Sequence, residues 1–214
     1  MKNISGIMLA LLLGYSGTAG AEDWQHWTTW SATHDVSERT QVSMLAEAYW
    51  RDQMSDDYVY DEYITYSRKL GHGFGAMGQA YFETVQPVNG EWNGTRSAVT
   101  GLFYASEFPG LFRWRIEDRL FYRLNSPADW DYHRPRLTIA RDLGPVILGV
   151  SDEMRVDLSR DRPNDFYRNR LFLSLSAKPA SFLLLGLGYV RQSDKSGPSW
   201  NSVNVLQTIV TVVY

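Results

Sequence analysis

The chain has 214 residues, with 21 Lys and Arg against 24 Asp and Glu, and this acidic balance argues against a nucleic-acid partner, which would require a basic surface. The absence of cysteine excludes a disulfide framework and a thiolate metal site. A mean hydropathy of −0.32 excludes a helical membrane protein but fits a barrel, whose wall alternates lipid-facing and lumen-facing residues.

Residues 1–21 have the pattern of a cleavable secretory signal peptide. Lys2 supplies a short positive region, Ile7 to Leu13 form an apolar run, and Ala19-Gly20-Ala21 is a small-residue cleavage site. The apolar run is too short to span a hydrocarbon core, which takes about 20 residues. We therefore expect the protein to be exported and residues 1–21 to be removed.

Residues 22–38 form a tryptophan-rich segment at the start of the mature chain. Trp24, Trp27 and Trp30 recur at every third residue, which differs from the two-residue period of a strand. We predict that Trp24–Thr33 forms a plug, a periplasmic flap or a partial strand. The barrel itself is then expected to comprise residues 39–214.

From Thr40 onward, the chain divides into segments of about a dozen residues with a two-residue period. Such segments are long enough for tilted membrane strands of about 9–11 residues. In residues 111–123, arginines alternate with apolar side chains, and Asp118 is the exception on the apolar face. The same alternation is seen in residues 40–51, 132–141, 166–177 and 181–192. Because the polar face is highly charged, we expect it to line a lumen, with the apolar face toward lipid.

The connections between these segments alternate in length. Short connections are expected at residues 34–38, 71–73, 109–110, 142–144 and 178–180, and longer polar ones at 52–56, 87–93, 125–131, 157–165 and 193–200. This alternation is typical of outer-membrane barrels, with short periplasmic turns and longer outer loops. Because an antiparallel barrel with both ends in the periplasm needs an even number of strands, the sequence predicts an all-β, transmembrane antiparallel β-barrel of about ten strands, with twelve as the alternative.

Charged residues are expected to line the lumen. The candidates are Glu47, Glu83, Arg113, Arg115, Glu117, Arg119, Arg134, Arg136, Glu153, Arg168 and Arg170. Enclosed charges must be paired or hydrated, and the planar guanidinium group suits bidentate pairing with carboxylates. The set is interpreted either as a structural network that fills a small barrel, which we favour, or as a selective lining for small polar or anionic solutes.

The last strand carries apolar or aromatic residues at alternate positions and ends on an aromatic ring. The residues of this face are Leu206, Thr208, Val210, Val212 and Tyr214. The pattern resembles the insertion signal of bacterial outer-membrane barrels. The resemblance implies recognition by the barrel-assembly machinery and a final location among outer-membrane lipids.

The sequence gives little support for catalysis. The four histidines share no metal-ligand spacing, so we expect no metal, no cofactor and no assigned catalytic residue. One enzymatic alternative is a lipase-like or acyltransferase-like barrel using His133, which follows a loop containing Ser126, Asp129 and Asp131. Another alternative is a soluble periplasmic barrel that binds an apolar ligand, with the two faces of each strand exchanged.

Several short clusters occur in an order and spacing that resemble a known family. They are residues 49–52 with 55–60, 113–119, 133–137, Asp152-Glu153, 165–171, and Trp200 with Asn204-Val205. Their succession is similar to that of the domain-of-unknown-function 2490 family of bacterial outer-membrane barrels. The resemblance covers essentially the whole mature chain, and it implies location and architecture but carries over no site. The function expected from the sequence is therefore an integral, non-enzymatic outer-membrane barrel with a structural or small-solute transport role.

Overall fold

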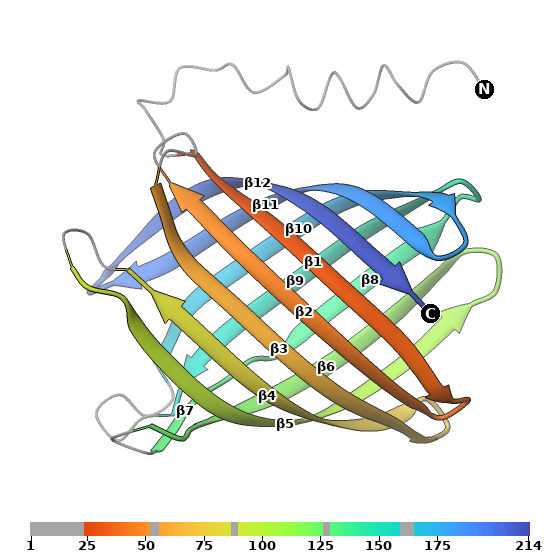
Figure 1. Ribbon diagram of the computed structural model, residues 1–214, viewed down its shortest axis with the longest axis horizontal. Coiled ribbons are helices and arrows are strands. Elements are labelled where there is room, and N and C mark those ends of the chain that lie inside the picture. The colour runs from red at the N-terminus through yellow and green to blue at the C-terminus, as the bar shows by residue number, and fades with distance from the viewer. Residues whose placement is uncertain (1–23, 52–55, 87–89, 126–128, 159–164) are drawn as a thin grey trace.

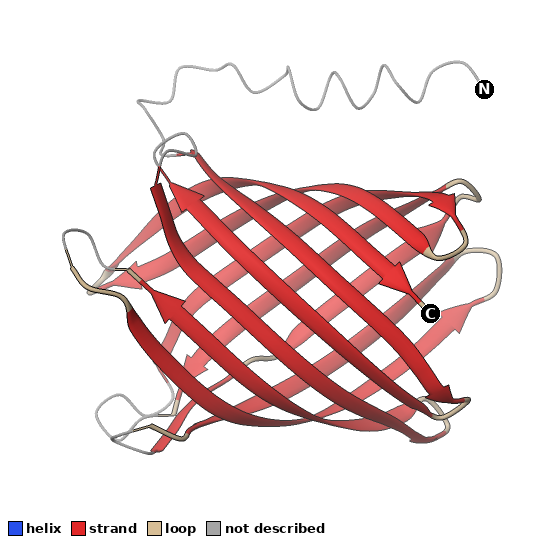
Figure 2. Cartoon of the chain, in the orientation of Figure 1, coloured by secondary structure: helices blue, strands red, loops and turns tan. Residues whose placement is uncertain are grey.

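The computed structural model describes residues 24–51, 56–86, 90–125, 129–158 and 165–214. All regular secondary structure in these ranges is β-strand (Figure 2). Within the same ranges, no helix is long and apolar enough to cross a membrane. The predicted signal peptide, residues 1–21, lies outside the described residues.

The described residues form one sheet that closes on itself as a barrel (Figure 1). Its strands are β1 (Trp24–Ser37), β2 (Thr40–Arg51), β3 (Asp56–Gly71), β4 (Phe74–Val85), β5 (Asn93–Phe108), β6 (Phe112–Arg123), β7 (Asp129–His133), β8 (Arg136–Asp142), β9 (Val146–Asp157), β10 (Asp165–Ala180), β11 (Leu183–Ser196) and β12 (Ser199–Val213). Neighbours in the chain pair antiparallel from β1 to β6 and from β9 to β12, and β12 returns to β1 to close the wall. The expected all-β barrel is thus confirmed.

β7 and β8 occupy one position in the wall, between β6 and β9. Both keep the same register with β6, since His133 is opposite Leu120 and Arg136 is opposite Glu117. Pro135 separates the two strands. Its carbonyl oxygen accepts a hydrogen bond from the Met154 N–H (3.0 Å), but proline has no backbone N–H, so it donates none and the ladder is interrupted there. The twelve strands therefore make eleven wall positions.

An odd number of positions makes β1 and β12 run in the same direction. Each antiparallel step reverses the strand direction, so the first and last of eleven positions must pair parallel. The seam runs from Trp24 opposite Asn204 to Thr33 opposite Val213. The expected plug, flap or partial strand is instead the full wall strand β1. The twelve strands match the alternative count expected from the sequence, and their eleven wall positions depart from the even-number argument because that argument assumed antiparallel pairing throughout.

The alternation of connection lengths separates the two ends of the barrel (Figure 1). At the short-turn end, the connections are residues 38–39, 72–73, 109–111, 143–145 and 181–182. At the long-connection end, they are residues 52–55, 86–92, 124–128, 158–164 and 197–198. Trp24 begins β1 at the long-connection end, whereas Tyr214 lies at the short-turn end. The sequence predicts both ends on the periplasmic side, but the two ends of the described chain lie at opposite ends of the barrel.

Two turns differ from the sequence prediction. The expected long loop 193–200 is a tight turn at residues 197–198, because β11 and β12 continue pairing up to Ser196 and Ser199. The turn expected at 178–180 lies at 181–182. By contrast, the tight turn after β3 occurs where expected, with φ values of 52° at His72 and 84° at Gly73, as a two-residue hairpin turn of mirror-image type requires.

The two faces of each strand are separated as the sequence predicts. In β6, Arg119 and Phe121 are buried inside the barrel. Ile116, on the opposite face of the same strand, is 50% exposed on the outer surface. The three-residue spacing of the tryptophans in β1 also fits a strand. Trp27 points inward and is 2% exposed, while Trp24 and Trp30 are on the outer face.

Candidate functional site

Glu153 on β9 is the centre of a charged network inside the barrel. Its side chain is 1% exposed, and Arg134 Nε lies 3.0 Å from Oε2. Arg119 and Arg136 approach the same oxygen at 3.5 Å and 3.7 Å, and Arg170 approaches Oε1 at 3.7 Å. These four arginines come from β6, β8 with its preceding linker, and β10, so the network joins neighbouring wall positions. A single carboxylate thus balances part of the charge of four guanidinium groups.

Glu117 continues the network toward the short-turn end. It accepts a hydrogen bond from Arg115 Nε at 2.7 Å, and it also lies 3.1 Å from Arg119 Nη2. The Arg115 guanidinium carbon is 4.0 Å from the centre of the Phe103 ring. Phe103 has room for this position because Gly75 faces it, and a Cβ at Gly75 would be 2.0 Å from the ring. Arg119 therefore links two carboxylates, and a packed ring orients Arg115.

The opposite part of the wall, from β2 to β4, carries a group of carboxylates and tyrosines. The Tyr49 hydroxyl lies 2.8 Å from Glu47 Oε2 and 2.9 Å from Asp61 Oδ2, and Tyr81 donates to Asp61 Oδ1 at 3.0 Å. Thr29 donates to the other oxygen of Glu47 at 3.0 Å. Because a phenol has one hydrogen, the Tyr49 hydroxyl shares it between the two carboxyl groups or donates to one of them at a time.

Charge is therefore divided across the lumen. Arginines gather on β6 to β10, and carboxylates bonded to hydroxyls gather on β2 and β3. Two clusters of aromatic rings and valines pack beside these charged groups. The buried members are Trp27, Tyr49, Val59, Val190 and Val205 in the first, and Tyr63, Tyr81, Val99, Phe121 and Tyr132 in the second. The long-connection half of the lumen is packed with side chains.

On β9 to β12, the short-turn half of the lumen is lined by small residues. Gly149 faces Ser174, Gly186 faces Ser176, and a Cβ added at either glycine would be 2.6 Å or 2.5 Å from the serine hydroxyl. Gly188 stands in the same way opposite Gln207, whose amide donates to Thr29 across the seam at 2.8 Å. On β9 to β12, small side chains thus line the short-turn half, whereas β5 and β6 place Phe103 and Arg115 there.

The remaining candidate lumen residues lie nearer the two rims. Arg113 and Arg115 line a cavity of about 420 Å³ at the short-turn end together with Glu107 and Thr138. Glu83 lines another cavity, of about 430 Å³, at the long-connection end. Arg168 pairs with Asp194 on the adjacent strand β11. Glu47 and Glu83 have no ion pair with an arginine among the described residues, so the predicted interleaving of charges holds for Glu117 and Glu153 but not for these two.

Sequence reasoning missed several members of the interior network. Arg155 lies over the Tyr132 ring at 4.9 Å, and it is 5% exposed. Its position two residues after Glu153 on the same strand was a usable signal, because alternate residues share a face. Asp61 was harder to find, since the register between β2 and β3 shifts at Tyr49/Trp50 and obscures which residues of β3 face inward.

Most of the outer surface is apolar, with a few polar exceptions. The face formed by Leu206, Thr208, Val210, Val212 and Tyr214 is on the outside, with Tyr214 74% exposed. Polar exceptions include an Asp118–His133 pair at 3.2 Å, an Asn169 to Asp152 hydrogen bond at 2.7 Å, and the exposed Glu62. His133 therefore points outward, and Asp131 pairs with Arg123 instead of with it. Ser126 lies outside the described residues, and the side chain of Asp129 is likewise not described.

Among the described residues, no three His, Asp or Glu side chains gather closely enough to hold a metal ion. No protein-family model, no curated protein and no solved structure matches the chain.

Proposed function

We propose that this protein is an integral barrel of the bacterial outer membrane. The observation that carries the proposal is the inversion of the closed wall, with an apolar outer surface around a charged interior. A row of aliphatic side chains crosses the middle of that surface. Its members, each at least 37% exposed, include Met44, Ile64, Leu102, Ile116, Leu137, Ile139, Leu148, Val150, Leu171, Leu173, Leu185, Leu187 and Leu206.

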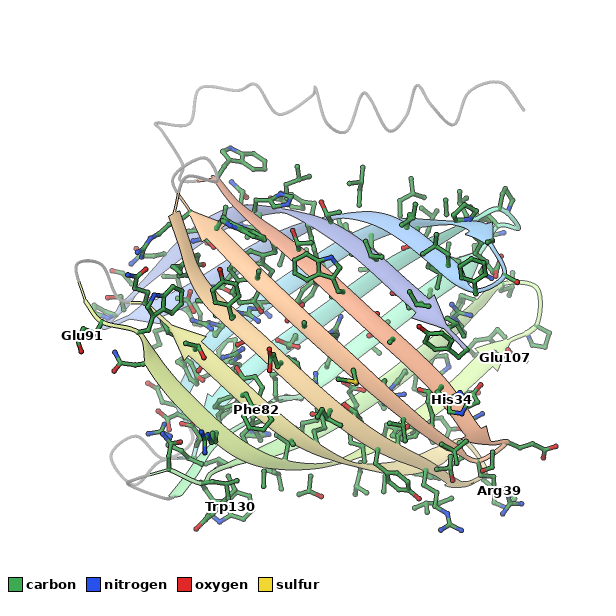
Figure 3. The ribbon with its side chains drawn as sticks, in the orientation of Figure 1. His34, Arg39, Phe82, Glu91, Glu107 and Trp130 are labelled. Carbon is green, nitrogen blue, oxygen red and sulfur yellow. The ribbon has the colours of Figure 1, made fainter. Side chains whose placement is uncertain are left out.

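Aromatic residues on the outer surface border this aliphatic band at both ends. At the long-connection end, Tyr122 packs against Trp130 and Phe166 packs against Trp200, with ring centres 5.2 Å and 5.1 Å apart. At the short-turn end, the Tyr104 ring lies between Phe74 and Trp114, at 4.8 Å and 5.2 Å. In Figure 3, Trp130 and Glu91 mark the long-connection end, and Arg39, His34 and Glu107 mark the other. Aromatic girdles around an apolar band are typical of membrane barrels.

The same arrangement argues against the soluble alternative. A soluble barrel binding an apolar ligand would place the charges outside and the leucines inside. Here Glu153 is 1% exposed while Leu173 and Leu185 are 43% and 45% exposed. In water, this surface would leave an apolar area much larger than soluble monomers show.

Further parts of the proposal rest on the sequence. We propose cleavage after residue 21, insertion by the barrel-assembly machinery through the outward face that ends at Tyr214, and membership of the domain-of-unknown-function 2490 family. The short-turn end would then face the periplasm, as in other barrels. β1 would begin at the outer rim, because it pairs parallel with β12.

Two roles fit this architecture, a rigid structural barrel and a pore for small polar or anionic solutes. The structural role is favoured, because Glu153, its four arginines and the aromatic clusters fill the long-connection half of the lumen. The pore role draws on the arginine-rich wall, which would select anions if the lumen opened. No catalytic step is part of either role.

Single-channel recording in planar bilayers separates the two roles. We expect the folded barrel to give no stepwise conductance, because the charged network and the packed rings occupy the long-connection half of the lumen. Stepwise currents with a preference for anions would instead establish the pore. Folding is verified separately in each preparation by a shift of the band on electrophoresis between heated and unheated samples.

A further inference from the structure

Asp118 and His133 form an ionisable pair on the outer surface. Asp118 is in the middle of β6 and its side chain is 51% exposed, and His133 ends β7 and is 28% exposed. His133 Nδ1 lies 3.3 Å and 3.2 Å from the two carboxylate oxygens of Asp118. The pair is unlike the charges of the interior network, because it faces the surroundings of the barrel.

The surface around this pair is apolar. Leu120 is opposite His133 and is 36% exposed. Met154 of β9, which hydrogen-bonds to Pro135 through its backbone, is 40% exposed. In a membrane, an ionisable side chain on the lipid-facing surface costs free energy, and such residues usually mark a functional site. This step rests on the membrane location proposed above. A pair that served only the wall would be replaceable by two apolar residues, as at neighbouring outward positions.

The hydrogen-bond chemistry fixes the state of the histidine ring. An ionised carboxylate can only accept hydrogen bonds, so the Nδ1 atom that faces Asp118 must carry a hydrogen. In the neutral ring, Nε2 then has a free lone pair, and among the described residues no hydrogen bond to Nε2 is found. A histidine oriented by a carboxylate in this way is suited to act as a general base.

The depth of the pair on the wall indicates which chemical group could reach it. Tyr122 and Trp130 pack together at the long-connection end, and aromatic residues of this kind are found at the level of the lipid head groups. Leu120 is two residues from Tyr122 and is opposite His133, so His133 is about 7 Å along the strand from the aromatic pair. The ester bonds that join acyl chains to lipid head groups lie at this depth, just inside the head-group level.

We propose that His133 and Asp118 form a catalytic dyad that hydrolyses acyl esters of outer-leaflet lipids. His133 Nε2 accepts a proton from a water molecule while the water oxygen bonds to the ester carbonyl carbon. In the tetrahedral intermediate, the bond between the carbonyl carbon and the oxygen of the lipid alcohol then breaks. The leaving alkoxide receives the proton from Nε2. The products are a fatty acid and a lipid with one acyl chain fewer. Asp118 is the positioning residue, which holds the ring with Nε2 toward the lipid.

The test uses the purified mature protein folded into two kinds of vesicle. One contains phosphatidylethanolamine and phosphatidylglycerol, and the other also contains lipid A, so the two arms identify which lipid supplies the ester. Fatty acid release is measured by mass spectrometry. We expect release by the wild type, and a loss of about 10²- to 10⁴-fold in His133→Ala, as removal of a general base produces.

The Asp118→Asn variant distinguishes positioning from a purely structural role. The maximal rate should fall with little change in KM. The matched control is His26→Ala, which changes another outward histidine, one that packs against Trp50 with ring centres 5.8 Å apart. This control should keep full activity.

Three results would overturn the dyad. They are no fatty acid release from either vesicle by wild-type protein that is shown to be folded by heat-modifiable electrophoresis, undiminished release by folded His133→Ala, and equal loss in His26→Ala. In each of these cases, the proposed membrane location survives. Should the wild type fail to insert into vesicles at all, the membrane location and the dyad would both be wrong.

Discussion

Glu153 is the residue on which the interior charge network depends. It is fully enclosed, and it lies within 3.7 Å of guanidinium nitrogens of four arginines. Arginine cannot lose its charge under ordinary conditions, so the four cations need this carboxylate. Removing one partner from a buried ion pair leaves charge without compensation, which is more costly than losing the attraction alone.

We therefore expect Glu153→Gln to lower the free energy of unfolding by about 3–5 kcal/mol. The measurement is urea unfolding of the vesicle-bound barrel, followed by tryptophan fluorescence. Glu91→Gln is the matched control, because Glu91 is exposed on a connection at the long-connection end (Figure 3). A change of about 0.5 kcal/mol or less is expected there. Similar small changes in both variants would show that the network does not stabilise the barrel.

The outward and inward faces predict a second pair of effects at the residue scale. Leu173 is outward and Ser174 is inward in the same strand. Leu173→Arg should cost about 2–4 kcal/mol if the position is at mid-membrane, because it places a charge against acyl chains. Ser174→Arg should cost less, since the small residues of the short-turn half leave it access to the lumen. Equal losses in the same unfolding measurement would mean that the faces are assigned wrongly.

At this scale, the sequence predicts which face a charge occupies better than it predicts the partner of that charge. The charged face of each strand was enough to place Arg119, on β6, and Glu153, on β9, in the lumen. The four arginines around Glu153, however, come from wall positions whose register is set by hydrogen bonding between strands. The Tyr49, Asp61 and Glu47 group was not predicted, because no single strand contains its pattern.

At the scale of elements, the seam between β1 and β12 is the main departure from the sequence prediction. Trp24–Ser37 pairs with β12 on one side and β2 on the other. Tryptophans at every third residue alternate between the two faces, which is compatible with a strand when bulky rings pack both inside and outside. Periodicity alone could not show this, and the assumption of an even strand number excluded it.

An engineered disulfide tests this seam directly. Thr28 and Thr208 are register partners and both face outward, and the chain has no native cysteine. We expect Thr28→Cys with Thr208→Cys to form a disulfide on oxidation of the folded barrel, seen as a faster band on non-reducing electrophoresis. The control is Thr28→Cys with Thr211→Cys, because Thr211 is three residues further and faces the lumen, where its hydroxyl is 2.8 Å from that of Ser31. No bridge in the first variant, or equal bridging in both, would exclude the parallel seam.

Other elements followed from the sequence with small differences. Residues 132–141 were treated as one segment, and they do occupy one wall position even though Pro135 divides them into β7 and β8. The order of short and long connections was also predicted, because turn residues such as Gly71-His72-Gly73 are local signals. Positions of the hairpin ends were less predictable, since β11 and β12 extend their pairing through polar residues that resemble a loop.

At the scale of the whole molecule, the protein is a closed wall that presents aliphatic and aromatic side chains outward and encloses the arginines around Glu153. Closure removes the free strand edges that an open sheet would expose. It also gives every wall position a hydrogen-bonded neighbour on both sides, as a strand that crosses lipid needs. Sequence alternation predicts the two faces, but only the pairing of β1 with β12 shows that the wall closes.

Fractionation of cells that produce the protein tests the membrane location most directly. We predict that the mature chain sediments with the outer membrane after osmotic shock, needs detergent for extraction, and changes mobility on electrophoresis when heated. Recovery of the folded chain as a dissolved monomer in the osmotic-shock fluid, without detergent, would contradict the account.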